Sequence, residues 1–137
     1  MKGKILFYPN YKFPEGNVND KFFIGLNNPD VEQDEPYLFA LTTSQTKNKI
    51  QTKGCHSERG YYVITQDDRA WFDKYPTFVK FDELIIVSAN SFIQQSINNN
   101  SWQEKGTIGD KLLRSIINCV IQCTDVPNLY KKILRVV

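Results

Sequence analysis

The chain has 137 residues, of which 41% are hydrophobic and 23% are charged. This length favours one domain with a substantial core, the composition is ordinary for a soluble globular protein, and no apolar run approaches the roughly 20 residues of a membrane-spanning helix. The net charge of +2 is too small to indicate a nucleic-acid-binding protein by its overall field, so any basic surface must be local.

The N-terminal residues and the cysteines bear on location and covalent structure. Pro9 and Asn10 interrupt the first apolar segment too early for a secretory signal, so we expect a cytoplasmic protein. The three cysteines are an odd number, and Cys119 and Cys123 are spaced i, i+4 in an expected helix, which argues against a disulfide framework. We interpret Cys119 and Cys123 as small core residues.

No resident metal or cofactor is expected. A zinc site would need more ligands than the single His56 and the cysteines readily offer. The sequence also lacks a Gly-rich phosphate loop, a CxxC pair, a GxSxG elbow and an HExxH motif, so no nucleotide cofactor is indicated.

In chain order, the first strand is expected at Lys4–Tyr8, because this segment is aromatic and branched. Residues 11–19 contain proline and glycine and indicate a loop. Tyr11 and Lys12 of this loop could lie over the rim of a sheet and contact RNA. A packed surface loop is the alternative.

Two apolar segments, Asp20–Asn27 and Leu38–Ser44, flank an acidic turn and predict a hairpin of buried strands. Lys21 begins the first strand, and Thr43 and Ser44 end the second. In an antiparallel pair the start of one strand lies near the end of the next, so we expect these three residues at one rim of the sheet. A cation beside two hydroxyls suits a phosphate, although the same residue types are also common in turns.

The polar segment after the hairpin contains Lys47, Lys49 and Lys53, which could follow an RNA backbone next to the rim. A solvated connection is the alternative interpretation. His56 is the only histidine in the chain, and its near-neutral titration makes it a candidate for acid/base catalysis. A surface or structural role is the alternative for His56.

The next strand is expected at residues 61–64, followed by a turn-rich connection over 65–76. Aromatic residues such as Trp71 in this connection could stack on unpaired bases or could plug the end of a small barrel. Residues 77–81 and 84–87 predict two further strands joined by a turn at Asp82–Glu83. About five or six short strands separated by turns indicate a compact barrel or roll.

The C-terminal part is expected to be helical. Ser91–Ile97 predicts a short helix, and residues 98–101 predict a break. Thr107, followed three residues later by Asp110, predicts the capping-box start of an amphipathic helix that ends at Cys123. A last short helix is expected after Pro127.

These elements together predict a mainly β protein with C-terminal helices, of class α+β. We expect one domain over residues 1–137, with a β-barrel core at 1–90 and a helical C-terminal extension at 91–137. The apolar face of the longer helix is expected to pack on the barrel, with the seam of a homodimer as the alternative.

Two stretches resemble the PemK/MazF-like toxin endoribonucleases. In that family a charged residue, usually Arg, opens a strand of the RPxxVL type, and a second strand ends in a Thr-Ser pair. Asp20–Asn27 and Leu38–Ser44 match these strands, with Lys21-Phe22 in place of Arg-Pro. The ToxN-related branch also looks to use Lys with Thr and Ser here. Thr77–Val87 is similar to the family's late strands, and the resemblance covers about residues 3–90.

The resemblance implies a small SH3-like, PemK-type β-barrel that is often a homodimer. It implies cleavage of single-stranded RNA without a metal or cofactor, and an antitoxin as partner. By this carry-over Lys21 corresponds to the charged residue, Thr43 to the catalytic hydroxyl and Ser44 to its neighbour.

The expected reaction is a transesterification. The 2′-hydroxyl of the RNA attacks the adjacent phosphorus and gives a 2′,3′-cyclic phosphate and a 5′-hydroxyl product, while Lys21 stabilises the charge that develops on the phosphate. His56 is the candidate base if it reaches the rim. The alternative function is a non-catalytic SH3-like module that binds RNA or a protein partner.

Overall fold

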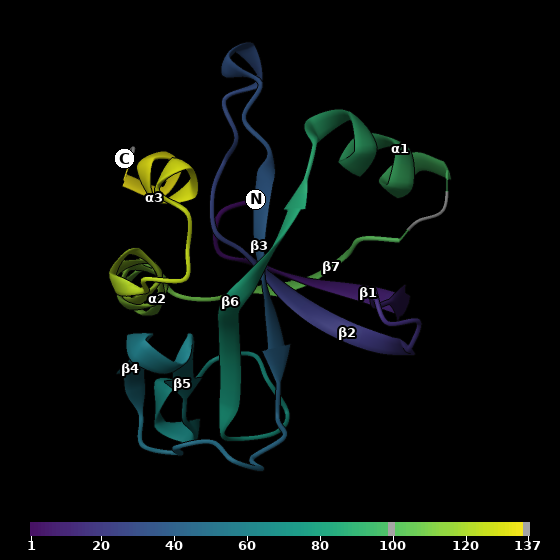
Figure 1. Ribbon diagram of the computed structural model, residues 1–137. Helices are drawn as coiled ribbons and strands as arrows, with labels where there is room; N and C mark the ends of the chain where they lie inside the picture. The colour runs from purple at the N-terminus through teal and green to yellow at the C-terminus, as the bar shows by residue number, and fades with distance from the viewer. Residues whose placement is uncertain (99–100, 136–137) are drawn as a thin grey trace.

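One antiparallel sheet dominates the computed structural model, which describes residues 1–98 and 101–135. In this part of the chain the sheet has seven strands in the order β4-β5-β6-β3-β2-β1-β7. Figure 1 shows the long strands crossing near the centre of the molecule. The strands are β1 (Lys4–Lys12), β2 (Val18–Gly25), β3 (Tyr37–Thr43), β4 (Gly54–His56), β5 (Tyr61–Ile64), β6 (Thr77–Val87) and β7 (Gln103–Thr107).

The helices lie on both sides of this sheet. In Figure 1, α2 and α3 lie next to each other on the side of β4 and β5, whereas α1 projects from the other side. None of the helices in the described ranges is long and apolar enough to cross a membrane. The helices are α1 (Ala89–Asn98), α2 (Asp110–Gln122) and α3 (Asn128–Arg135).

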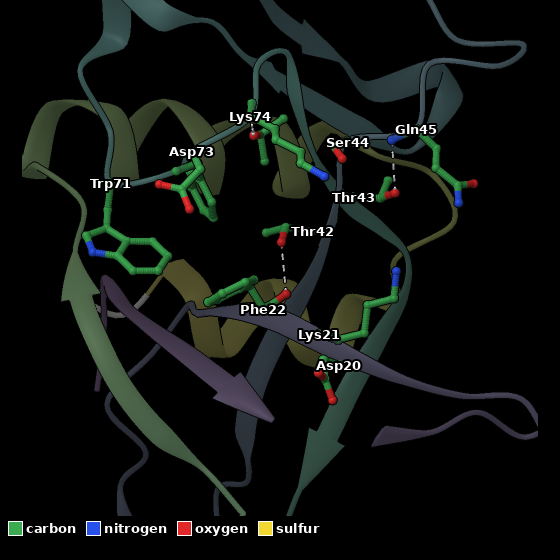
Figure 2. Close-up of a pocket in the computed structure, with 12 residues that line it drawn as sticks. Asp20, Lys21, Phe22, Thr42, Thr43, Ser44, Gln45, Trp71, Asp73 and Lys74 are labelled. Carbon is green, nitrogen blue, oxygen red and sulfur yellow. Dashed lines mark hydrogen bonds between the residues drawn. The ribbon is translucent and has the colours of Figure 1, made fainter. Parts of the chain in front are cut away.

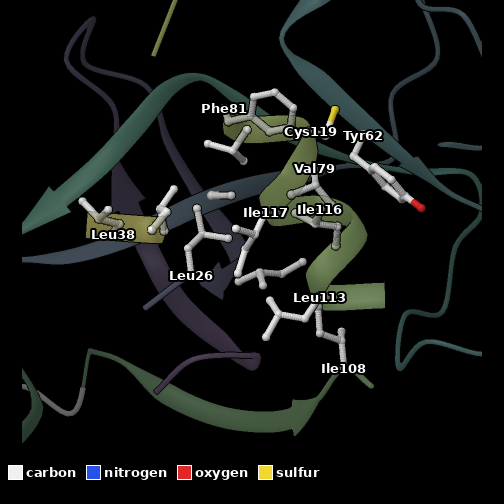
Figure 3. Close-up of a cluster of buried hydrophobic side chains, with 14 of the residues drawn as sticks. Leu26, Leu38, Tyr62, Val79, Phe81, Ile108, Leu113, Ile116, Ile117 and Cys119 are labelled. Carbon is white, nitrogen blue, oxygen red and sulfur yellow. The ribbon is translucent and has the colours of Figure 1, made fainter. Parts of the chain in front are cut away.

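The main core lies between one face of the sheet and α2. Side chains alternate along a strand, so one face of the central parts of β2, β3 and β6 is turned toward this helix. The buried side chains that meet there include Leu38, Val79, Ile116 and Ile117 (Figure 3). Burying a side chain of this size contributes about 1.5–3 kcal/mol, so the apolar stripe of α2 fixes the helix on the sheet.

The opposite face of the sheet carries a smaller aromatic cluster. Phe23, Phe39 and Trp102 are buried in it, and Phe92 of α1 packs against them. This face therefore holds α1 while the other face holds α2. The mainly β architecture with helices late in the chain agrees with the sequence-based expectation, as do the hairpin of β2 and β3 and the position of β5.

The segment Thr77–Val87 is one continuous strand, so the predicted turn at Asp82–Glu83 is wrong. The pairing of β6 with β3 changes register between Phe39 and Leu41, from Phe39↔Ile85 to Leu41↔Lys80. The additional residues are therefore accommodated as a bulge-like irregularity inside the strand. A polar pair in a strand can mark such an irregularity as well as a turn.

Thr107 does not start the long helix as predicted, because it is the last residue of β7 and pairs with Lys4 of β1. Helix α2 begins at Asp110 instead, and its N-cap residue Gly109 makes no side-chain capping bond. The segment expected to be wholly helical thus returns to the sheet. The first and last helices lie close to their predicted positions, and residues 99–100 of the predicted break are outside the described ranges.

The prediction that the cysteines form no disulfide is wrong. Cys55 of β4 is bonded to Cys119 of α2, with Cα atoms 5.5 Å apart, and Cys123 is a free buried thiol. The two bonded residues are 64 positions apart in the sequence, and only the packing of α2 over β4 and β5 brings them together. Cysteine spacing alone could not indicate this pairing.

We expect the disulfide to stabilise the fold by restricting the unfolded chain. The double variant Cys55→Ser, Cys119→Ala should lose about 2–4 kcal/mol of unfolding free energy in denaturant titrations. A reductant should lower the stability of the unmodified protein by a similar amount and leave the double variant unchanged. If reductant does not change the denaturation midpoint of the unmodified protein, the bond between these residues is contradicted.

Candidate active site

A cavity of about 310 Å³ lies where β2 begins and β3 ends. Its size is at the lower end of the range found for ligand sites, and it is open to solvent. Figure 2 shows the side chains around it, which come from the β2–β3 hairpin and from the loop before β6. The lining residues are Asp20, Lys21, Phe22, Thr42, Thr43, Ser44, Gln45, Trp71, Phe72, Asp73, Lys74 and Thr77.

The pairing of β2 with β3 brings Lys21 and Thr43 to this cavity. Continuing the register Phe23↔Leu41 by two residues puts Lys21 opposite Thr43. The Thr42 hydroxyl donates a hydrogen bond of 2.9 Å to the Phe22 carbonyl and ties the two strand ends together. The cavity is therefore built where two paired strands end. Lys21, Thr43 and Ser44, which were predicted to meet at the rim, line it together.

Among the described residues, none accepts a hydrogen bond from the Thr43 O–H. Its oxygen accepts a hydrogen bond of 3.3 Å from the backbone N–H of Gln45. A hydroxyl can accept and donate at the same time, so the Thr43 O–H can still donate to a ligand oxygen. Ser44 is the next residue and is exposed to solvent beside it.

Lys21 is partly buried, and this burial matters for its charge. Burial lowers the pKa of the Lys21 amine from its ordinary value of 10.5, and repulsion from Lys80 lowers it further. The amine also lies 5.8 Å from the centre of the Phe13 ring. A bound anion would offset both the lost hydration and the repulsion, so the surroundings of Lys21 favour an anionic ligand.

The opposite wall comes from residues 71–74 in the loop before β6. Lys74 supplies a second cation, and in Figure 2 its amine points toward Ser44. The loop is held by hydrogen bonds of 2.6 Å from the Tyr75 hydroxyl to the Ala70 carbonyl and from the Thr77 hydroxyl to the Lys74 carbonyl. The cavity thus has Lys21 on one side and Lys74 on the other. Hydrogen bonds hold the backbone segments that carry both lysines.

Sequence reasoning did not assign Asp73 or Lys74 to the site. The mixture of aromatic and charged residues over 65–76 was the available signal, and it suggested base stacking for Trp71 without linking this loop to the hairpin. The link depends on how β6 pairs with β3, which brings Thr77 beside the end of the hairpin. Residue types alone do not specify that pairing.

His56 is not among the residues that line the cavity. Its Nε2 atom lies 2.8 Å from the Thr52 carbonyl oxygen, and its ring packs near Tyr61. The geometry therefore lends no support to His56 as the base. Its surroundings fit the structural role that was the alternative in the sequence.

The lysines after the hairpin also lie outside the cavity lining. Lys53 forms ion pairs of 2.8 and 3.0 Å with Asp67 and Asp68, and hydrogen bonds to these two carboxylates raise the pKa of the Lys53 amine. Lys49 donates to the Gln45 carbonyl at 3.0 Å and so lies close to the end of the hairpin. Lys47 is exposed, where a nucleic-acid backbone could reach it.

Tyr11 and Lys12 belong to the end of β1 and not to a separate loop. Tyr11 packs against Phe13 and Phe23, and Lys12 pairs with Val18 across the hairpin and is exposed. Neither residue lines the cavity. The hairpin nevertheless affects the site indirectly, since it holds the Phe13 ring near Lys21.

Within residues 1–98 and 101–135, no three or more His, Cys, Asp or Glu side chains are grouped so that they could hold a metal ion. Comparisons with protein-family models, curated proteins and solved structures gave no match.

We expect Lys21 to cost the fold some stability at neutral pH. Because the folded state lowers the pKa of Lys21, the unfolded state binds more protons, and stability rises as pH increases through the lowered pKa. Lys21→Met should therefore leave the unfolding free energy unchanged or raise it by up to about 1 kcal/mol at neutral pH. This gain should shrink near the ordinary lysine pKa of 10.5.

Denaturant titrations at neutral and alkaline pH measure this effect, with Lys12→Met as the control at an exposed lysine of the neighbouring strand. A loss of stability in Lys21→Met that is absent in Lys12→Met would contradict the expectation that burial of Lys21 destabilises the fold.

Proposed function

We propose that the protein is an endoribonuclease that cleaves single-stranded RNA by transesterification, without a metal. The observation that carries this proposal is the gathering of the Lys21 ammonium and the Thr43 and Ser44 hydroxyls in one open cavity. A cation and hydroxyl donors around an open cavity suit the phosphate of a chain that passes through it. The same three residues carry the resemblance to the PemK/MazF-like toxins.

In the proposed reaction the 2′-oxygen of the RNA forms a bond to the adjacent phosphorus while the bond from phosphorus to the 5′-oxygen breaks. The 2′-hydroxyl loses its proton and the departing 5′-oxygen gains one. Negative charge grows on the nonbridging oxygens, where Lys21 is the main stabilising cation and Lys74 a second one. The Thr43 hydroxyl donates to the same phosphate and holds it for in-line attack. We assign no residue to the base.

The finer fold and the partners belong to the same proposal. We interpret the seven-stranded sheet as a PemK-type, SH3-like barrel that is incompletely closed, with the hairpin of β2 and β3 at its mouth. An antitoxin that covers the cavity would inhibit the enzyme in the cytoplasm. A homodimer is part of the same proposal.

Replacing the Lys21 ammonium tests the proposal directly. Lys21→Ala should lower RNA cleavage at least about a hundredfold, since single electrostatic donors at a reacting oxyanion contribute this much. Purified protein is incubated with mixed single-stranded RNA in the presence of EDTA, and fragments with 2′,3′-cyclic phosphate ends are quantified. Lys132→Ala, at an exposed lysine of α3 outside the cavity, is the control and should cleave normally. Equal cleavage by both variants would refute the role of Lys21.

The pH dependence distinguishes a cation from a base at Lys21. If the charged amine is required, kcat/KM should fall as pH rises through the lowered pKa of Lys21, below the ordinary 10.5. Lys21→Arg should keep some activity and should lose this fall, because a guanidinium remains charged. A rate that rises with pH through the same range would instead indicate that Lys21 accepts a proton.

A second candidate function is a non-catalytic module that binds RNA or a protein partner. The observation that favours it is the lack of a histidine among the described residues that line the cavity. Binding of RNA by the unmodified protein without any fragments, in the same assay, would select this function.

A further inference from the structure

The Trp71 indole forms one wall of the cavity and remains 38% exposed. It lies directly against Gly106 of β7, where an added Cβ atom would be only 2.9 Å from Cδ1 of Trp71. The Phe22 ring, with its centre 5.2 Å away, packs beside it. The indole is therefore supported by the sheet while part of its surface faces the cavity. An exposed, supported aromatic ring is a platform on which nucleobases stack.

Asp73 lies beside this platform on the same loop. Its side chain is exposed, lines the cavity and is drawn on the same side as Trp71 in Figure 2. None of the hydrogen bonds and ion pairs found within the described residues uses the Asp73 carboxylate. Both oxygens are thus available to a ligand. An ionised carboxylate only accepts hydrogen bonds, so its preferred ligand has two neighbouring donors.

Among the RNA bases, guanine presents such a pair on its Watson–Crick edge, the N1–H and the N2 amino group. Adenine and cytosine place a ring nitrogen acceptor next to their amino group, and uracil has one N–H between two carbonyl oxygens. These acceptors repel a carboxylate. Unpaired bases are read on this edge when they are stacked on aromatic side chains.

We propose that the cavity is a guanine-binding site, in which the base stacks on Trp71 and donates hydrogen bonds from N1 and N2 to Asp73. In Figure 2 the pair Trp71 and Asp73 lies across the cavity from Lys21 and Thr43. The phosphate next to the bound guanosine therefore lies toward Lys21. Only this last placement rests on the proposed function, because binding of the base does not require cleavage.

The test uses short 2′-O-methyl oligouridines that carry one central guanosine, adenosine or cytidine, so that no 2′-hydroxyl can attack. Binding is measured by fluorescence anisotropy of labelled oligonucleotides and by quenching of tryptophan fluorescence. The guanosine oligomer should bind about ten- to a hundredfold more tightly than the others. It should quench the tryptophan fluorescence of the unmodified protein but not that of Trp71→Phe. The tryptophan that remains in this variant, Trp102, is buried at 7% exposure.

Three variants separate stacking from base reading. Asp73→Asn should abolish the preference for guanosine, since the amide offers a donor in place of one acceptor oxygen. Gly106→Ala should displace the indole and weaken all three oligomers about equally, as should Trp71→Ala. Leu129→Ala, at an exposed apolar residue of α3 outside the cavity, is the control and should bind normally.

Equal affinity for the three oligomers, an Asp73→Asn variant that keeps the preference, or no binding at all would each overturn the guanine site. These outcomes are independent of the cleavage assay. A guanosine preference together with equal cleavage by Lys21→Ala and unmodified protein would retain the base site and remove the nuclease assignment. Cleavage that depends on Lys21, together with equal binding of the three oligomers, would retain the nuclease assignment and remove the guanine site.

Discussion

The antiparallel register of β2 and β3 is the constraint on which the site depends. A shift of one residue would turn Lys21 and Thr43 to the opposite face, into the layer that Ile24 and Ala40 occupy under α2. The shift would move Phe23 and Phe39 out of the aromatic cluster into the layer under α2 and would bury a lysine there. The packing on both faces of the hairpin therefore opposes the shift. The energy that holds the lysine at the cavity therefore comes from apolar side chains elsewhere in the same strands.

The position of Lys21 lowers the stability of the fold, and the same position favours binding of an anion. Lys21 is partly removed from water and faces a like charge on Lys80, so its ammonium is poorly solvated before any ligand arrives. In the proposed reaction, a bound phosphate would supply this counter-charge with little reorganisation of the protein. Preorganised charge of this kind is how enzymes stabilise a transition state without moving their own groups.

The sequence was informative where side-chain alternation is strong and uninformative where tertiary contacts decide. The hairpin with Lys21 was predictable, because its apolar strands have clear limits and antiparallel pairing fixes which ends meet. Strand β7 was not, because Glu104 and Lys105 face solvent at the edge of the sheet and show no apolar alternation. The bond between Cys55 and Cys119 and the approach of Lys74 likewise depend on how elements distant in sequence pack.

The contact between Trp71 and Gly106 has a consequence for how the protein becomes competent during synthesis. The ribosome makes the hairpin and the loop first, but the strand that supports the indole follows α1 in the chain. A nascent or prematurely terminated polypeptide that stops before residue 103 contains Lys21, Thr43 and Trp71 yet has no β7 behind the ring. If the proposed RNA cleavage is correct, such a delay would protect the translating ribosome and its messenger until the sheet is complete.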